Sequence, residues 1–150
     1  MPDPIGLMQA ILGFPTSRHS AEIELRRALA AHTDPMHWCA VRFAIAPDEV
    51  MRRASDWADL PFAPYIPGEP EPVSEVPKLR HLADIRMMSQ RNGDQRLAYV
   101  APDFFGFLRL RERAAENASL RDRLGVVPCA QLRERIIQQF GPALIDEGRQ

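Results

Sequence analysis

The last third of the chain alternates apolar and polar residues in an order that predicts a strand followed by a helix. The run at residues 95–101 is typical of a strand, and it ends before Pro102, which has no backbone N–H to donate to a sheet. Asp103 is a favourable N-cap, so a helix is expected to begin there. Apolar residues at three- and four-residue steps predict the buried stripe of this helix, namely Phe104, Phe107, Leu110, Ala114 and Ala118.

A second strand and a second helix are expected after it. Val126 and Val127 form a very short apolar run, and the pattern beyond it is helical until Gly141-Pro142 ends it. The apolar face of this last helix is predicted to be Leu132, Ile136, Ile137 and Phe140. Two strands joined by one crossover helix should lie parallel, so the chain is expected to end as a β-α-β-α unit.

The first sixty residues predict three helices. Residues 20–31, with Ser20 as the cap, place Ile23, Leu25, Leu29 and Ala30 against the polar Glu22, Glu24, Arg26 and Arg27. Residues 35–44 offer Met36, Cys39, Val41 and Phe43 as an apolar face. Pro47 suits a first helical turn, and it opens a helix over residues 47–60 whose apolar face is Val50, Ala54, Trp57 and Ala58.

Composition changes abruptly after these helices. Six prolines fall between residues 61 and 77, together with Glu69, Glu71 and Glu75, so neither a helix nor a central strand is expected there. The apolar members Phe62, Tyr65, Ile66 and Val73 predict a surface loop that is pinned to the core. Beyond it, residues 82–88 and 95–101 flank an Asn-Gly turn within residues 91–94, which predicts an antiparallel hairpin.

These elements predict an α+β fold in a single domain covering residues 1–150. It has a helical part (1–60), a Pro-rich loop (61–78), and a hairpin plus β-α-β-α part (79–150) with a small mixed sheet. One core is expected to join the two halves through its aromatic side chains, Trp57, Phe62, Phe107 and Phe140.

Charge and cysteine usage narrow the class of protein. The formal net charge is −1, so no strong field attracts nucleic acid or anionic lipid. Eighteen of the 19 basic residues are arginine, which is consistent either with coding bias or with selection for bidentate phosphate binding.

Cys39 and Cys129 are far apart and suit reduced thiols of the cytoplasm. Neither a signal peptide nor an apolar run long enough to span a membrane is recognisable.

The sequence offers no recognisable catalytic centre. His37 and Cys39 are one residue apart, but a metal site needs three or four converging ligands and no second cluster supplies them. His19, His32 and His81 are scattered among polar residues and predict surface positions. Nucleophile elbows, phosphate-binding glycine loops and zinc-binding helices are all absent, so we expect neither enzyme activity nor a cofactor or metal.

Three segments together resemble one family: residues 54–62, residues 97–124 and residues 126–141. In order and pattern they are similar to the small N-terminal domain of type II secretion and type IV pilus assembly ATPases. The resemblance is closer to the form of this domain that precedes bacterial family 2 membrane glycosyltransferases, which make exopolysaccharide. It implies a non-catalytic cytoplasmic docking or regulatory domain, attached to the inner membrane through a protein partner or through the rest of such a transferase.

The same resemblance implies two alternatives: an adaptor domain of a secretion or pilus ATPase, and a sensor of cyclic di-GMP. Ligand-binding members carry a duplicated motif that begins Arg-Leu-Gly in the N-terminal half. The corresponding candidates here are Arg26, Arg27, Arg52 and Arg53, but neither pair is followed by the expected glycine and no duplication can be aligned. Nucleotide binding through these arginines is therefore the alternative, and docking is the main expectation.

Overall fold

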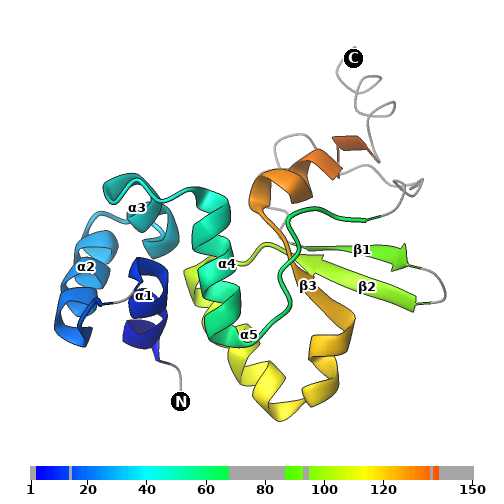
Figure 1. Cartoon of the computed structure of the whole chain (residues 1–150), viewed down its shortest axis with the longest axis horizontal. Coiled ribbons are helices and arrows are strands. Elements are labelled where there is room, and N and C mark those ends of the chain that lie inside the picture. The colour runs from blue at the N-terminus through cyan, green and yellow to red at the C-terminus, as the bar shows by residue number, and fades with distance from the viewer. Residues whose placement is uncertain (1–2, 14, 68–86, 93–94, 136, 139–150) are drawn as a thin grey trace.

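The computed structural model describes residues 3–13, 15–67, 87–92, 95–135 and 137–138 of the chain. Within these residues, helices come first and a three-stranded mixed sheet with its own helices follows, so the fold is α+β, as predicted. Figure 1 shows the helical half on one side of the molecule and the sheet half on the other. No helix in the described part of the chain is long and apolar enough to cross a bilayer.

Four helices make up the N-terminal half: α1 (Pro4–Leu12), α2 (Arg18–Ala30), α3 (Pro35–Arg42) and α4 (Pro47–Ala58). Prolines open α1, α3 and α4 at positions where no N–H donor is needed. The sequence pattern predicted only three helices, the first of which was expected to begin at Ser20. That prediction is wrong, since α1 forms before them and completely buries Leu7, Met8 and Ile11.

The rotation of α2 about its axis differs from the one predicted. Its N-cap is Ser17, whose side chain accepts a hydrogen bond from the backbone N–H of Ser20, so Ser20 lies in the first turn. The buried face consists of Ala21, Glu24, Leu25 and Ala28, whereas three of the four residues predicted to be apolar and internal are exposed, namely Ile23, Leu29 and Ala30. Small alanines face the core because α1 and α3 pack closely against this helix.

Helix α3 ends earlier than predicted. Met36 and Cys39 are buried as expected, but Val41 is 69% exposed and Phe43 lies just beyond the helix at 43% exposure. Helix α4 buries Val50, Ala54 and Ala58 as predicted, and Trp57 is half-buried. It stops where Asp59 adopts the left-handed conformation, with a φ of 59°, so the predicted extension to Leu60 is also corrected.

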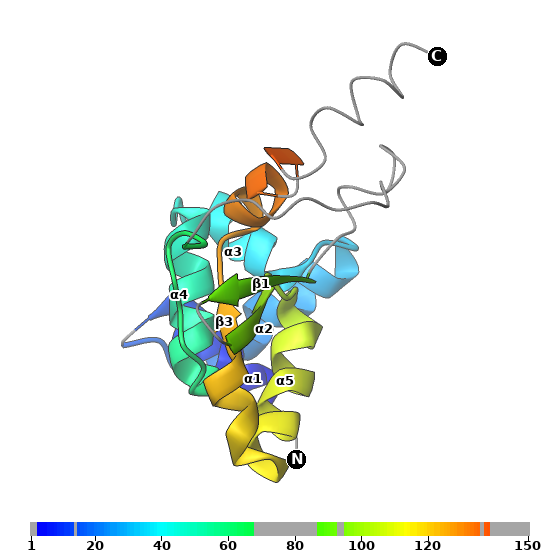
Figure 2. The ribbon, with the colours of Figure 1, turned by 90° about the vertical axis from the view of Figure 1, so that its right-hand side faces the viewer.

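The sheet contains β1 (Met87–Asn92), β2 (Gln95–Val100) and β3 (Leu124–Val126) in that order. The antiparallel pairing of β1 with β2 and the parallel pairing of β2 with β3 are as predicted. β3 covers Leu124–Val126, however, so the strand predicted at Val126 and Val127 begins two residues earlier and does not include Val127. The first strand runs to Asn92 rather than ending at residue 88, and residues 82–86 lie outside the described part. Figure 2 looks onto this end of the molecule, with β1 in front.

The start of the Pro-rich segment adds to the sheet. Phe62 forms an isolated parallel bridge with Val126, through Val126 N–H donating to Pro61 O and Ala63 N–H donating to Val126 O, both at 2.8 Å. Ile66 then buries its side chain, and Arg135 donates to the carbonyl oxygens of Ile66 and Pro67 at 3.1 and 2.8 Å. The loop is thus pinned as far as residue 67. Of the four apolar residues expected to pin it, Phe62 packs against the core and Ile66 is buried, Tyr65 is 63% exposed, and Val73 lies outside the described residues.

The crossover between β2 and β3 consists of α5 (Phe104–Glu116) and a 3-10 helix, η2 (Ala118–Arg123). Asp103 caps α5 by accepting from the Gly106 N–H at 2.7 Å, and Phe104 and Phe107 are fully buried, as predicted. Ala118 is exposed because α5 ends two residues before it, so its predicted place in the buried stripe is wrong.

A last helix is described at residues 129–135 and 137–138. Leu132 is fully buried as predicted, but Ile137 is 49% exposed, and buried Arg135 occupies the core-facing position instead. Ile136, Phe140 and the expected end at Gly141-Pro142 lie outside the described residues.

One cluster of buried side chains extends from α1 to Leu132, with Trp57 and Phe62 packed against it. Asp34 joins the two halves directly. One of its carboxylate oxygens caps α3 by accepting from the Met36 N–H, and the other accepts from the Phe104 N–H at the start of α5, at 3.1 and 3.0 Å. This supports the expectation of a single domain, which stays a prediction.

Candidate functional site in the helical half

The four arginines that the resemblance points to lie on α2 and α4, and each pairs with a carboxylate of its own helix. On α2, Arg26 donates to Glu22 at 2.6 Å on the solvent side, and Arg27 donates to Glu24 at 2.9 Å. The first pair is a surface contact of the kind that contributes little to stability. The second differs because Glu24 is buried, with only 8% of its surface exposed.

Glu24 accepts hydrogen bonds at both of its oxygens. Oε1 accepts from Arg27, while Oε2 accepts from the indole Nε1–H of Trp38 at 3.0 Å and from Nε of Arg42 at 2.9 Å. Burial alone would raise the pKa of Glu24. The Trp38 hydrogen bond and the two guanidinium charges outweigh it, so the pKa of Glu24 lies below its ordinary value. This carboxylate therefore stays charged and joins α2 to α3.

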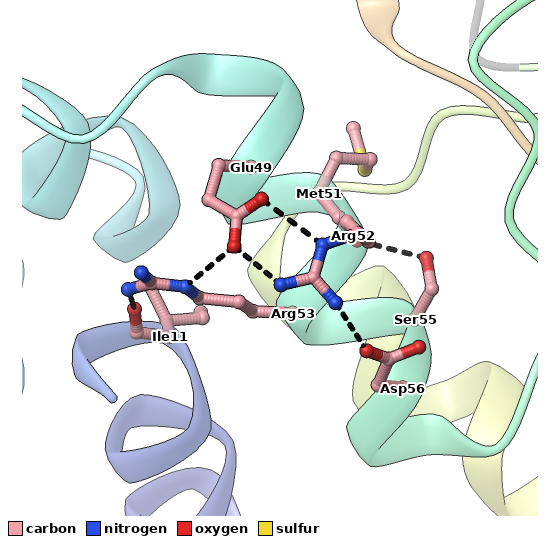
Figure 3. Close-up of polar contacts among 7 residues, drawn as sticks. All are labelled: Ile11, Glu49, Met51, Arg52, Arg53, Ser55 and Asp56. Carbon is pink, nitrogen blue, oxygen red and sulfur yellow. Dashed lines mark hydrogen bonds and ion pairs between the residues drawn. The ribbon is translucent and has the colours of Figure 1, made fainter. Parts of the chain in front are cut away.

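A second cluster lies on α4, where Glu49 accepts from both Arg52 and Arg53 (Figure 3). Arg52 also reaches Asp56 one turn later, at 2.7 Å. The hydrogen bonds from Arg52 and Arg53, followed by their charges, lower the pKa of Glu49 to about 2. Figure 3 shows the Arg52 guanidinium lying between the carboxylates of Glu49 and Asp56.

Arg53 points the other way, toward α1. Its Nη1–H donates to the carbonyl oxygen of Ile11 at 2.8 Å, while its Nε–H is held by Glu49 at 3.1 Å (Figure 3). Ile11 lies in the last turn of α1, where carbonyl oxygens have no partner within the helix. Arg53 therefore has a structural role that sequence reasoning did not foresee, which is to tie the end of α1 to α4.

Two of the four arginines line the same groove, with a volume of about 570 Å³, which we call the helical groove. Arg27 lines it from α2 and Arg53 from α4, whereas Arg26 and Arg52 do not. The apolar part of its lining is Leu12, Ile23, Phe43 and Ile45. Glu24, Thr16 and Ser20 complete its polar part. The structure thus brings together half of the predicted site residues. It adds four apolar residues, of which Ile23 and Phe43 had been predicted on the apolar faces of helices.

A second cavity of about 440 Å³ lies where the two halves meet. His37 and Cys129 line it, together with residues near the start of α3 and α4 and with Pro102 and Asp103, which precede α5. Cys39 is instead fully buried, 3.7 Å from the sulfur of Met8, and burial raises the pKa of its thiol to about 12. His37 and Cys39 therefore face different surroundings. Among the described residues, no group of three or more His, Cys, Asp or Glu side chains could hold a metal ion.

His19, His32 and His37 are all exposed, and His81 lies outside the described residues.

Comparison of the chain with protein-family models, with curated proteins and with solved structures finds no match. The family resemblance remains an expectation that the sequence patterns alone support.

Proposed function

We propose that this chain is a non-catalytic docking or regulatory domain. The observation that carries the proposal is the helical groove, in which two large apolar side chains, Ile23 and Phe43, remain 37% and 43% exposed beside two guanidinium groups. Apolar side chains gathered at a concave surface and edged by charge are typical of protein recognition sites. The buried carboxylate of the groove, Glu24, joins α2 to α3, so its charge has a structural role that fits a binding scaffold.

The resemblance supplies the system in which this domain works. We place it at the cytoplasmic face of the inner membrane, in a bacterial exopolysaccharide glycosyltransferase assembly, where its partner is the transferase or a protein attached to it. The β2-α5-β3 order and the last helix are consistent with the pattern on which the resemblance rests.

The experiment is deletion of the coding sequence in the native cell, followed by quantification of secreted exopolysaccharide. We expect a loss that the wild-type chain restores when it is expressed in trans. Unchanged exopolysaccharide would contradict the proposed system.

The purified chain should not hydrolyse ATP or sugar nucleotides. Turnover that a point substitution abolishes would contradict the non-catalytic assignment.

Cyclic di-GMP sensing is the second candidate, because Arg27 and Arg53 line one groove whose volume is in the range of small-molecule sites. The glycines expected of ligand-binding members are missing, and no duplicated motif can be aligned, so the close backbone approach that such a ligand needs is absent. We therefore expect no binding. Calorimetric titration at physiological salt is the test, and micromolar affinity that disappears in Arg27→Ala would favour the sensor over the docking domain.

A further inference from the structure

We infer that the helical groove docks a segment of a partner protein that carries carboxylates next to apolar side chains. This inference rests on the proposed docking function and adds the chemistry of the partner. It follows from what the groove offers and from what it lacks, which are set by five residues: Ile23, Glu24, Arg27, Phe43 and Arg53.

The groove offers charged hydrogen-bond donors, whereas its carboxylate is already occupied. Glu24 is the only carboxylate among the described residues that line the groove, and its two oxygens already accept from Trp38, Arg27 and Arg42. By contrast, Nε and Nη2 of Arg27 and Nη2 of Arg53 donate to no residue in the described part of the chain. These free donors favour an occupant that brings acceptors, and a carboxylate matches the planar donor pair of a guanidinium.

The positions of the two arginines add a geometric requirement. Arg27 belongs to α2 and Arg53 to α4, and the apolar side chains of the groove come from α1, α2 and the segment that follows α3. Acidic groups of the occupant should therefore flank an apolar portion. An amphipathic protein segment provides this combination, and recognition of such segments by grooves and by arginine clusters is common. A basic segment would instead be repelled by both guanidiniums.

The test is an NMR titration of the ¹⁵N-labelled full chain with a synthetic amphipathic peptide built from Glu, Leu and Phe. We expect saturable shifts of amide signals from residues 23–27, 43–45 and 53. Two control peptides, one with every Glu replaced by Lys and one with every Leu and Phe replaced by Ser, should bind at least about tenfold more weakly. Equal binding of the Lys peptide, shifts confined to other surfaces, or affinity for the acidic peptide weaker than about 1 mM would overturn the inference.

Matched variants locate the contact. Arg27→Gln should weaken binding about tenfold or more, because a charge-assisted hydrogen bond is lost, whereas Arg26→Gln on the same helix but outside the groove should not. Phe43→Ser should weaken binding, whereas Phe105→Ser, at nearly the same exposure on α5, should leave it unchanged. Phe43 is exposed, so its variant tests the groove even if Arg27→Gln loses stability. Equal effects within either pair would contradict the inference.

The outcome is separable from that of the proposed function. If deletion lowers exopolysaccharide but the acidic peptide does not bind, the chain docks through another surface and the inference fails alone. If the peptide binds in the groove but deletion leaves exopolysaccharide unchanged, the chemistry of the groove stands and the proposed system fails.

Discussion

Glu24 holds α2 and α3 together from a position where burial alone would disfavour a carboxylate. Its three donors belong to Arg27, Trp38 and Arg42, and Arg42 also stacks within 5.9 Å of the Trp38 ring. Glu24→Gln keeps the shape but removes the charge that both guanidiniums require. We expect this substitution to lower the free energy of unfolding by about 1–3 kcal/mol, measured by urea denaturation.

Glu22 provides the matched control for this substitution. It lies two residues earlier on α2 and pairs with Arg26 at the surface, where side-chain exposures are 37% and 77%. Glu22→Gln should cost less than about 1 kcal/mol. Equal losses in the two variants would show that Glu24 acts as an ordinary surface residue.

The lowered pKa values of Glu24, Glu49 and Asp3 predict how stability depends on pH. A carboxyl whose pKa is lower in the folded state than in the unfolded state stabilises the fold above its unfolded pKa. As the pH falls, the unfolded chain takes up protons first. The temperature of the unfolding midpoint should therefore decrease as the pH is lowered from about 4.5, the ordinary pKa of glutamate, to about 2, the pKa of Glu49 in the folded state.

Salt supplies the control for the pH experiment. The ion pairs of Glu49 are at the surface, so about 1 M salt should screen them and reduce the amount by which they lower the unfolding midpoint at acid pH. Glu49→Gln should likewise make the decline shallower. A midpoint that stays constant down to pH 2 would contradict the assigned ion pairs.

At the scale of elements, α5 is anchored by one face of aromatic side chains. Phe107 is fully buried, so Phe107→Ala should cost about 3–5 kcal/mol of unfolding free energy, because it removes the buried ring and leaves a cavity. Phe105 is 42% exposed and makes an edge-to-face contact with Phe104, with ring centroids 5.3 Å apart. Phe105→Ala should cost about 1 kcal/mol or less. Similar losses would mean that Phe107 is not in the core.

Elements with a strong local signal were predictable from the sequence. Helix α5 was predicted from the N-cap at Asp103, the proline at residue 102 and the periodicity beyond them. The hairpin was predicted from the Asn-Gly turn signal in the sequence of residues 91–94. The orientation of α2 was not predictable in the same way. Its apolar residues fit two phases, and tertiary packing selected the one that places Ala21 and Ala28 inside, leaves Ile23 outside and buries Glu24. The signal that could have identified this phase is the regular spacing of the two alanines with Leu25.

At the scale of the whole molecule, the two halves are connected by Asp34 and by the pinned start of the Pro-rich segment. Arg135 holds that segment through the carbonyl oxygens of Ile66 and Pro67. Arg135→Met keeps the length of the side chain and removes these donors, so chymotrypsin should cut after exposed Tyr65 faster than in the wild type. Arg133→Met, an exposed position on the same helix, should not change the rate.

Rapid cutting of the wild type into two stable folded fragments would contradict the single-domain prediction. The interactions concerned are long-range, because Arg135 and Ile66 are 69 residues apart in the chain. No local pattern could have identified the pair.

The same reason limits what the sequence could predict of the candidate site. The resemblance pointed to four arginines, and two of them, Arg27 and Arg53, meet in the helical groove. Their carboxylate partners and the bond from Arg53 to the end of α1 depend on how α1, α2 and α4 pack. Ile23 and Phe43 were predicted to be internal, so the apolar part of the groove emerged only from the structure.

Docking through the helical groove is the central claim, and site-specific photo-cross-linking in the native cell tests it most directly. The photoreactive amino acid p-benzoylphenylalanine replaces Phe43 in one variant and Phe105 in the other, two phenylalanines that are 43% and 42% exposed. From position 43 we expect one dominant adduct, in which the cross-linked peptide of the partner is acidic and apolar and which Arg27→Gln strongly reduces. Absence of that adduct, or the same adduct from position 105, would contradict docking in the groove.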